Sequence, residues 1–458
     1  MEVANLDIAD IASKTVELSV KSGANQAEVY AIRVKTASTY IDDDIPKIGG
    51  FLTEFGIGLK YIIGKKIGFT SSTLAQETPK DVVERAKSIA RVSNDDARFV
   101  SLPEPKKVSG SPDKFYDSDT AAADSVVLME KAMQVVNGAV ADNVTVPNGS
   151  LRTSAVRYHV CNSLGIDAGS KATVTFGFFT AKSQDGDKVG EGVQRCWSRE
   201  LESIDFHGLG EYMKSQALSV LKAKAFKDKW EDSVAVLAPS EGSEILYSLV
   251  AHAISGENVN KRSSPWADKM GEPVASENLS IVDNGQSKHG LLSSVIDDEG
   301  VPTQKTPTIE KGVLKSYLFD SYNAYQLEMQ STGNGIRRIA RDLAGRFTVP
   351  AVCAGTTMEV LPGTKSVDEI IGEIKRGVYV EHFAWPIVDP MSGTFSNEIR
   401  NARIIENGEL GEPIKHALWV GNLYESLKGN IMVANDPEVH DKRVVPTIAF
   451  PGTEVIGQ

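Results

Sequence analysis

The sequence predicts an α+β protein with two domains. Residues 1–228 are expected to form an N-terminal α/β domain, in which helices accompany an antiparallel sheet. Residues 229–458 are expected to form a β-rich domain with a barrel-like or antiparallel sheet. Three observations support this prediction. The 458 residues exceed the roughly 100 to 200 of a single domain, helical and strand-like segments alternate in the first half, and turn signals recur in the second.

Helical spacing alternates with strand patterns through the first half. Apolar residues recur every three or four positions within residues 8–20, 81–92 and 121–137, so each of these segments is predicted to be a helix. Strands are predicted where β-branched and aromatic residues cluster between Gly, Asn and Ser signals. These strands cover residues 27–34, 38–42, 56–69, 150–160 and 172–180.

The second half begins with a short apolar strand at residues 234–239, and we place the domain boundary near residue 228. A helix is expected at 243–255 and a short one at 367–375. The remaining segments are short and apolar, and turn signals separate them. These signals lie at 283–285, 297–300, 311–312 and 406–408. Regular turns between short strands favour an antiparallel or barrel-like sheet.

The composition is that of an ordinary globular protein, with 41% apolar and 24% charged residues. The net charge of −12 opposes broad nucleic-acid binding, since Lys and Arg supply the affinity for phosphates. No apolar run approaches the ~18 to 20 residues of a membrane span. The first ten residues carry acidic side chains where a secretory signal carries basic ones. We therefore expect a cytoplasmic protein that contacts neither membranes nor nucleic acid directly.

The most informative motif begins on the predicted helix at 243–255, where residues 244–257 read E-I-L-Y-S-L-V-A-H-A-I-S-G-E. Further motifs follow it in a fixed order. They read G-E-P-V-A-S-E at 271–277, I-V-D-N-G at 281–285, S-T-G-N-G at 331–335, D-P-M-S-G-T-F-S at 389–396 and I-I-E-N-G at 404–408. Together they resemble the TldD/PmbA family, historically described as modulators of DNA gyrase, over most of residues 56–458.

The resemblance implies a degenerate metal motif. In the metal-bearing TldD branch the helix carries H-E-x-x-x-H, and alignment on Gly256 places Tyr247 at the first histidine, Ser248 at the glutamate and His252 at the second histidine. A hydrolytic zinc site needs about three protein ligands and a base. Tyrosine, with an unperturbed pKa of ~10, is a poor ligand at neutral pH, and serine cannot act as a carboxylate base.

The metal-bearing branch also takes a cysteine ligand from near its C-terminus. This chain has no cysteine after Cys353, and the corresponding residues 419–435 offer amide, phenol and carboxylate groups instead. The resemblance therefore implies a PmbA/TldE-like member with no catalytic residue, no metal and no cofactor of its own. The zinc is expected in a TldD-like partner.

Three residues are candidates for a substrate cleft: His252, Asn334 and Arg337. His252 lies on the degenerate helix, but a lone histidine is more often held by a local hydrogen bond than used as a ligand. Asn334 and Arg337 belong to the S-T-G-N-G loop and the arginine cluster behind it, Arg337, Arg338, Arg341 and Arg346. Arginines there could grip a carboxylate or a phosphate. The competing interpretation is a solvated face or salt bridges.

The resemblance leads to one principal hypothesis. It implies the metal-free subunit of a TldD/TldE-type metallopeptidase complex, which degrades unfolded or extended peptides. The expected partner is a TldD-like homologue in a heterodimer, with a homodimer left open. Extended peptides could be held by strand addition to a sheet edge.

Two alternatives remain. One is a non-proteolytic regulatory or binding protein, as the gyrase-modulator description implies, acting on a topoisomerase or another partner. The other is a stand-alone hydrolase with a relocated metal site. The sequence clusters no His, Cys and carboxylate ligands for such a site, although folding could bring distant residues together.

Overall fold

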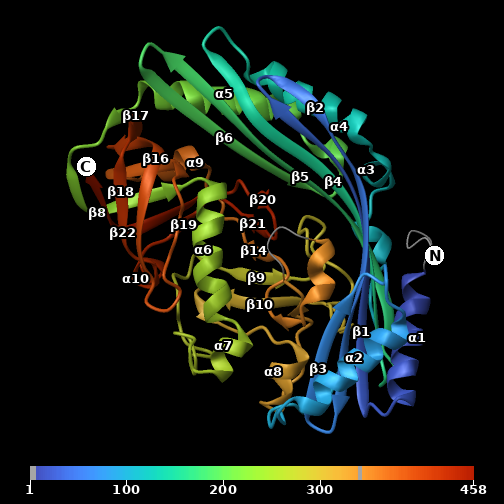
Figure 1. Cartoon of the computed structure of the whole chain (residues 1–458). Helices are drawn as coiled ribbons and strands as arrows, with labels where there is room; N and C mark the ends of the chain where they lie inside the picture. Colours follow the sequence, from blue (N-terminus) through green and yellow to red (C-terminus); the bar gives the residue numbers. More distant parts are fainter. Residues whose placement is uncertain (1–6, 339–342, 458) are drawn as a thin grey trace.

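The first half of the chain forms a six-stranded antiparallel sheet in the order β3-β2-β1-β4-β5-β6. The computed structural model describes residues 7–338 and 343–457. The strands are β1 (Gln26–Asp42), β2 (Ile45–Ile63), β3 (Lys66–Ser72), β4 (Val144–Asn162), β5 (Asp167–Asp185) and β6 (Lys188–Ser198). Four of them are 17 to 19 residues long, and the sheet curves around the rest of the molecule like half a barrel (Figure 1).

Helices cover the outer face of this half-barrel (Figure 1). They are α1 (Ile8–Lys21), α2 (Pro79–Val92), α3 (Ser118–Ala122), α4 (Ser125–Ala139) and α5 (Phe206–Lys222), with a 3-10 turn at Leu201–Ser203. A further 3-10 turn at Pro112–Phe115 packs Phe115 in the core of the inner face. α1 and α2 pack on one end of the sheet and α4 and α5 on the other, each pair over its own apolar core. α4 and α5 cross at Gly138 and Gly210, where an added Cβ would lie 2.2 Å from a carbonyl oxygen of the facing helix.

The second half contains a closed barrel. Its sheet runs β15-β8-β22-β18-β16-β17-β7, and an additional pairing of β15 with β16 closes five of these strands into a ring. The strands are β7 (Lys224–Ala225), β8 (Lys229–Leu237), β15 (Arg376–Phe383), β16 (Thr394–Glu406), β17 (Glu409–Lys415), β18 (Ala417–Asn422), β19 (Met432–Val433) and β22 (Ile448–Gly457). Trp419 is fully buried, with its ring 4.0 Å from that of Phe395 and 5.5 Å from that of Phe383.

A second six-stranded sheet lies between the barrel and the half-barrel, in the order β11-β10-β9-β14-β21-β20. Its strands are β9 (Ile281–Asn284), β10 (Lys305–Glu310), β11 (Val313–Leu314), β14 (Met358–Val360), β20 (Glu438–His440) and β21 (Arg443–Val445), beside the pair β12 (Gly335–Ile336) and β13 (Val352–Cys353). The helices of this half are α6 (Pro239–Ala253), α7 (Gly256–Asn260), α8 (Ser321–Tyr325), α9 (Val367–Gly372) and α10 (Leu423–Lys428), with a 3-10 turn at Ala344–Thr348.

The helix α6 stands at the centre of the second half and buries its apolar side chains in the largest core (Figure 1). It begins four residues earlier than expected because Pro239 occupies its first turn, where a missing N–H costs no hydrogen bond.

Buried polar contacts join the two halves. Arg337 Nη2 donates to Glu28 Oε1 at 2.8 Å. Tyr158 Oη donates to the carbonyl of Ile296 at 2.8 Å. These contacts hold the open side of the half-barrel against the second half.

The predicted α+β class, with an antiparallel first sheet and a barrel-like second half, is confirmed. The predicted boundary near residue 228 falls between β7 and β8. β7 already pairs with β17 of the second half. The second half also contains parallel pairs that the sequence did not indicate, β8 with β15 and β14 with β21. Among the described residues, no helix has the length and apolarity that crossing a membrane requires.

Candidate functional site

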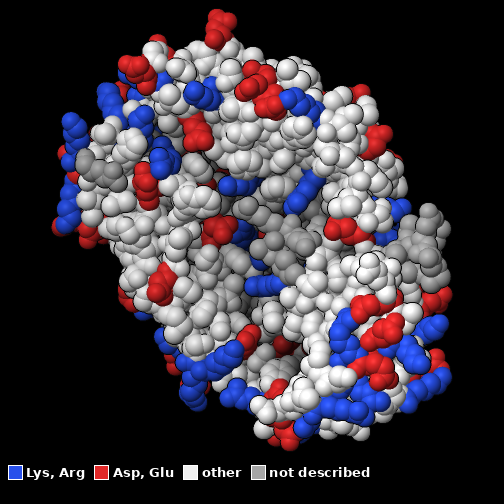
Figure 2. All heavy atoms as spheres, in the orientation of Figure 1, with Lys and Arg blue, Asp and Glu red and all other residues white. Residues whose placement is uncertain are grey.

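A cavity of about 990 Å³ lies between the concave face of the half-barrel and the second half of the chain. Figure 2 shows the hollow in the face of the molecule, with Lys and Arg side chains around it. Both halves contribute to its lining, so neither half forms the cavity alone.

Alternate residues of three strands form the upper wall of the cavity. They are Arg152 and Ser154 on β4, Val174, Phe176, Phe178 and Thr180 on β5, and Glu191, Val193, Arg195 and Trp197 on β6. The residues between them point the other way, and several of these contribute to the core beneath α4 and α5. On the wall, arginines lie over aromatic rings. Arg195 lies 5.4 Å from the centre of the Phe178 ring and Arg152 5.1 Å from that of Phe176.

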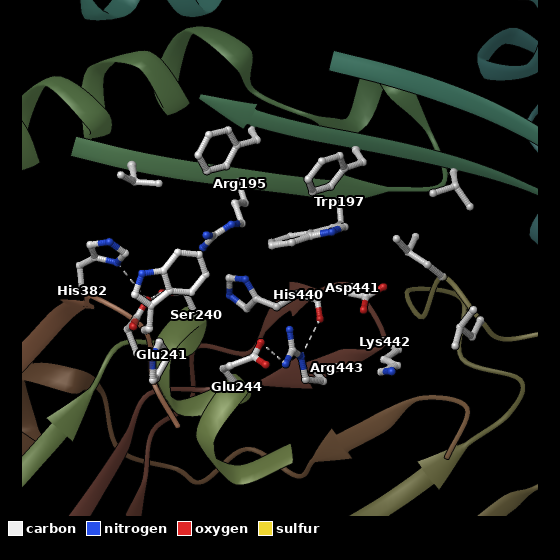
Figure 3. Close-up of a pocket in the computed structure, with 18 of the residues that line it drawn as sticks. Arg195, Trp197, Ser240, Glu241, Glu244, His382, His440, Asp441, Lys442 and Arg443 are labelled. Carbon is white, nitrogen blue, oxygen red and sulfur yellow. Dashed lines mark hydrogen bonds and ion pairs between the residues drawn. The ribbon is translucent and has the colours of Figure 1, made fainter. Parts of the chain in front are cut away.

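The opposite wall comes from the start of α6, the end of β15 and the turn between β20 and β21 (Figure 3). Glu244 of α6 forms an ion pair with Arg443. Glu241, one turn earlier, accepts a hydrogen bond from the Phe383 N–H at 3.1 Å. The rings of His440 and Trp197 are nearly perpendicular, with 5.5 Å between their centres, and this contact joins the two walls.

The cavity is basic although the chain is acidic. Its lining holds eight Lys and Arg residues and four Asp and Glu residues, whereas the whole chain has a net charge of −12. The basic residues are Arg152, Arg195, Arg337, Arg338, Arg346, Arg400, Lys442 and Arg443, and the acidic ones are Glu191, Glu241, Glu244 and Asp441. Arg337, Arg346 and Arg400 pair with carboxylates outside the lining, so the attraction for anions rests on the other basic residues.

Tyr247 marks the place where three basic side chains converge. Arg338 Nη2 donates to Tyr247 Oη at 3.0 Å. Lys442 Nζ lies 4.7 Å from the centre of the tyrosine ring, and the Arg443 guanidinium lies 5.6 Å from it. The position that corresponds to a metal-binding histidine in the resemblance is therefore surrounded by cations in this chain.

Ser248 and His252 are held by local hydrogen bonds. Ser248 Oγ donates to the carbonyl of Glu244 at 2.8 Å within the helix. His252 Nδ1 is 3.0 Å from the Asn258 amide nitrogen, and His252 Nε2 is 3.0 Å from the carbonyl oxygen of Ser263. Both ring nitrogens thus have partners, and neither residue lines the cavity.

Asn334 lies in the buried centre of the second half. Its amide donates to Asp283 at 2.8 Å and to the carbonyl of Ala354 at 3.0 Å. Burial raises the pKa of Asp283 to about 6, against the hydrogen bonds from Asn334 and Thr356 that lower it. Asn334 is 1% exposed and does not line the cavity, so its contacts are structural.

Arg337 reaches the lining of the cavity, but its guanidinium is fully buried and paired with Glu28. Arg346 likewise pairs with Asp298, whereas Arg338 reaches Tyr247. Arg341, the fourth member of the predicted cluster, lies outside the described residues. The cluster thus contributes one ion pair between the halves, one ion pair within the second half and one arginine at Tyr247.

The residues around the degenerate helix do not fit a zinc ion. Tyr247 and Ser248 are poor ligands at neutral pH, and the cations Arg338, Lys442 and Arg443 would repel Zn²⁺.

The C-terminal segment that the resemblance pairs with this helix does lie nearby. Met391 touches His252, and Tyr424 Oη donates to the adjacent Pro390 carbonyl at 2.8 Å. This segment brings the phenol of Tyr424 to the site, where the resemblance places a cysteine thiolate in the metal-bearing branch.

One trio of potential metal ligands occurs elsewhere within residues 7–338 and 343–457. His159, Cys161 and Asp167 lie at the β4–β5 hairpin, with ligand atoms within 4.8 Å of one another. Asp167 already accepts from His159 at 2.6 Å and from the Cys161 thiol at 3.3 Å. Burial raises the pKa of the Cys161 thiol, which opposes formation of the thiolate that a metal requires. We therefore interpret the trio as a local ion pair above a buried thiol.

The sequence reasoning missed most residues of the cavity. Arg152 lies on β4, Arg195 lies on β6, and Lys442 and Arg443 lie where the turn after β20 enters β21, so three distant segments supply these residues. Part of the signal was present in the sequence, since Glu191, Arg195 and Trp197 of β6 share one face of the strand. That pattern indicates a sheet with one polar face, but not what lies opposite it.

Comparisons with known proteins agree with this fold. Models of the PmbA/TldA metallopeptidase C-terminal domain and domain 1 match residues 232–457 and 27–90. An uncharacterized protein of Methanocaldococcus jannaschii is 28% identical over 96% of this chain and 98% of that protein. A metalloprotease TldD homolog of Haemophilus influenzae is 34% identical over 43% of this chain and 39% of that protein. TldE from Thermococcus kodakarensis, at 24% identity, superposes with a TM-score of 0.86 over 97% and 99% of the two chains. The chain belongs to the TldD/PmbA family of metallopeptidase-type proteins.

Proposed function

We propose that this chain is the metal-free subunit of a TldD/TldE-type metallopeptidase complex that degrades unfolded or extended peptides. A TldD-like homologue supplies the zinc and the catalytic base, and the two chains act as a heterodimer. The observation that carries the proposal is the environment of Tyr247, where three cations occupy the place of a metal centre.

The cavity supports a role in holding substrate. Its volume of about 990 Å³ and its open face suit an extended peptide segment rather than a folded domain. One wall is the concave face of a long sheet, which is held in shape by its own hydrogen bonds and by the helices outside it. In this role the chain contributes a preformed surface and the partner contributes the chemistry.

The test is a reconstitution. The chain is purified alone and co-expressed with its TldD-like homologue, and hydrolysis of casein and of an unstructured peptide is measured with and without a chelator. The proposal predicts activity only in the co-expressed sample, and loss of that activity with the chelator. Chelator-resistant hydrolysis by the chain alone would contradict it. Failure to form a complex, together with retained binding to a topoisomerase, would favour the regulatory alternative.

A further inference from the structure

Two basic side chains at Tyr247 are available for a ligand. Arg443, the third cation there, is already paired with Glu244. Arg338 and Lys442 form no ion pair with an acidic group among the residues that the structure describes, and both line the cavity. Asp441 is the acidic lining residue next to Lys442 in sequence.

Tyr247 contacts both of these cations. Its hydroxyl accepts from Arg338 at 3.0 Å while its ring face lies 4.7 Å from Lys442 Nζ. The tyrosine itself sits on α6, whose apolar side is buried in the main core, so the cations approach a rigid element. A preformed pair of donors avoids the entropy cost of gathering two long side chains when a ligand binds.

We propose that Arg338 and Lys442, aligned by Tyr247, bind a carboxylate of an extended peptide in the cavity. This inference rests on the proposed function, since it names the chemical feature of the peptide that the subunit recognises. A guanidinium at the hydroxyl and an ammonium over the ring face of one tyrosine suit a carboxylate, which accepts charge-assisted hydrogen bonds on both oxygens. The carboxylate can be the C-terminus of the peptide or an Asp or Glu side chain.

The upper wall of the cavity, formed by β4, β5 and β6, favours the same ligand. Arg195 and Arg152 lie over Phe178 and Phe176, so this wall offers basic groups beside apolar ring faces. A peptide anchored at Tyr247 would meet surfaces that accept both side-chain carboxylates and apolar side chains. A phosphate backbone would also be attracted to basic groups and rings, and the experiment therefore includes a nucleic acid.

The experiment measures binding to the full chain alone, without partner or metal, by fluorescence anisotropy. Four labelled unstructured peptides share one sequence without Asp or Glu, apart from the tested group. They carry a free C-terminal carboxylate, a C-terminal amide, an amide with one internal Asp, or an amide with Asn at that position. A labelled single-stranded oligonucleotide is the fifth probe.

We expect at least one carboxylate peptide to bind about ten-fold more tightly than its amide counterpart. Lys442→Met and Arg338→Gln are each expected to abolish this preference without changing the thermal midpoint by more than a few degrees. Lys21→Met, on the exposed side of α1, should leave it intact. The comparison of the two carboxylate peptides identifies the source of the group.

Equal affinity for carboxylate and amide peptides would overturn the inference, and so would a preference that survives both substitutions. Tighter binding of the oligonucleotide than of any peptide would overturn it in favour of a nucleic-acid site. Because no partner is present, the result is independent of the reconstitution. An inactive co-expressed pair with an intact carboxylate preference would refute the proposed function alone.

Discussion

Arg337 and Glu28 are 309 residues apart in the sequence and form an ion pair of 2.8 Å in which neither side chain is exposed. The guanidinium also lies 4.7 Å from the centre of the Tyr30 ring. The pair joins β1, a central strand of the half-barrel, to the second half.

Arg337→Met is predicted to lower the free energy of unfolding by about 3 to 5 kcal/mol, because it leaves the Glu28 carboxylate buried without its main partner. Urea unfolding followed by tryptophan fluorescence measures the loss. The double variant Glu28→Gln/Arg337→Met should recover much of it. Arg262→Met, which breaks an exposed pair with Asp268, should cost no more than about 1 kcal/mol. Similar losses for both arginines would contradict this account of the interface.

Gly58 on β2 marks a second close contact between the halves. A Cβ there would lie 2.3 Å from the carbonyl oxygen of Phe347, so the 3-10 turn at Ala344–Thr348 would have to move. Gly58→Ala is predicted to destabilise the chain by about 1 to 3 kcal/mol through this overpacking. Gly372→Ala is the matched control, since nothing lies within 4 Å of its added Cβ. A thermal midpoint equal in both variants would show that the turn yields freely.

Glu299 predicts a pH dependence of stability. Burial, and then the charge of Asp320, raise the pKa of Glu299 to about 7, while an unfolded chain has a glutamate near the ordinary value of about 4.3. Between these values the folded state binds more protons, so the free energy of unfolding falls as pH rises through that window and is level outside it. Burial shifts Asp297 and Asp320 in the same direction.

The free energy of unfolding of Glu299→Gln is therefore predicted to fall less between about pH 4 and pH 7 than that of the parent chain. The substitution removes one of the buried groups whose ionisation in this range destabilises the folded state. In the parent chain the Ser321 N–H donates a hydrogen bond to the Glu299 carboxylate at 2.8 Å, and the amide oxygen of the glutamine can accept the same bond. Chemical denaturation over a series of pH values gives the slope. Glu130→Gln, at an exposed position of α4, should leave the slope unchanged. A slope in Glu299→Gln equal to that of the parent chain would contradict the assignment.

His252 is predicted to act in structure rather than in substrate binding. Its two nitrogens contact Asn258 and Ser263, so His252→Ala should cost about 1 to 3 kcal/mol by leaving these groups without a partner. Peptide hydrolysis by the reconstituted complex should keep its KM and kcat at a temperature where the variant is folded. The exposed His207→Ala should change neither stability nor activity. Loss of activity at unchanged stability in His252→Ala would place this histidine in the active cleft.

Local patterns in the sequence predict the elements better than their arrangement. The apolar spacing of residues 8–20 and 81–92 locates α1 and α2 within a residue or two, because each helix buries one face. The helix α5 was missed, since Gly208 and Gly210 weaken its helical pattern, yet Gly210 is required where α5 crosses α4. Closure of the barrel depends on pairing β8 with β15, far away in the chain, and no local pattern encodes it.

The candidate site, too, was predictable from the sequence only in part. The motif around Tyr247 and Ser248 locates the central helix and its missing ligands from the sequence alone. The cations around Tyr247 come from Arg338 and Lys442, which only the folded chain brings to that ring. Asn334 and Arg337 are predicted in the cleft because their loop matches the family motif. Arg337 reaches the lining with its guanidinium paired to Glu28, whereas Asn334 is buried away from the cavity against Asp283.

The most direct test of the central claim is the zinc content of the purified chain, measured by elemental analysis alone and after co-expression with its TldD-like homologue. The account predicts that the chain alone contains no stoichiometric zinc even after incubation with the metal, and that the co-expressed pair contains one zinc held by the homologue. One zinc per chain in the isolated protein, retained through dialysis, would contradict the account, because a metal would then be held despite the cations around Tyr247.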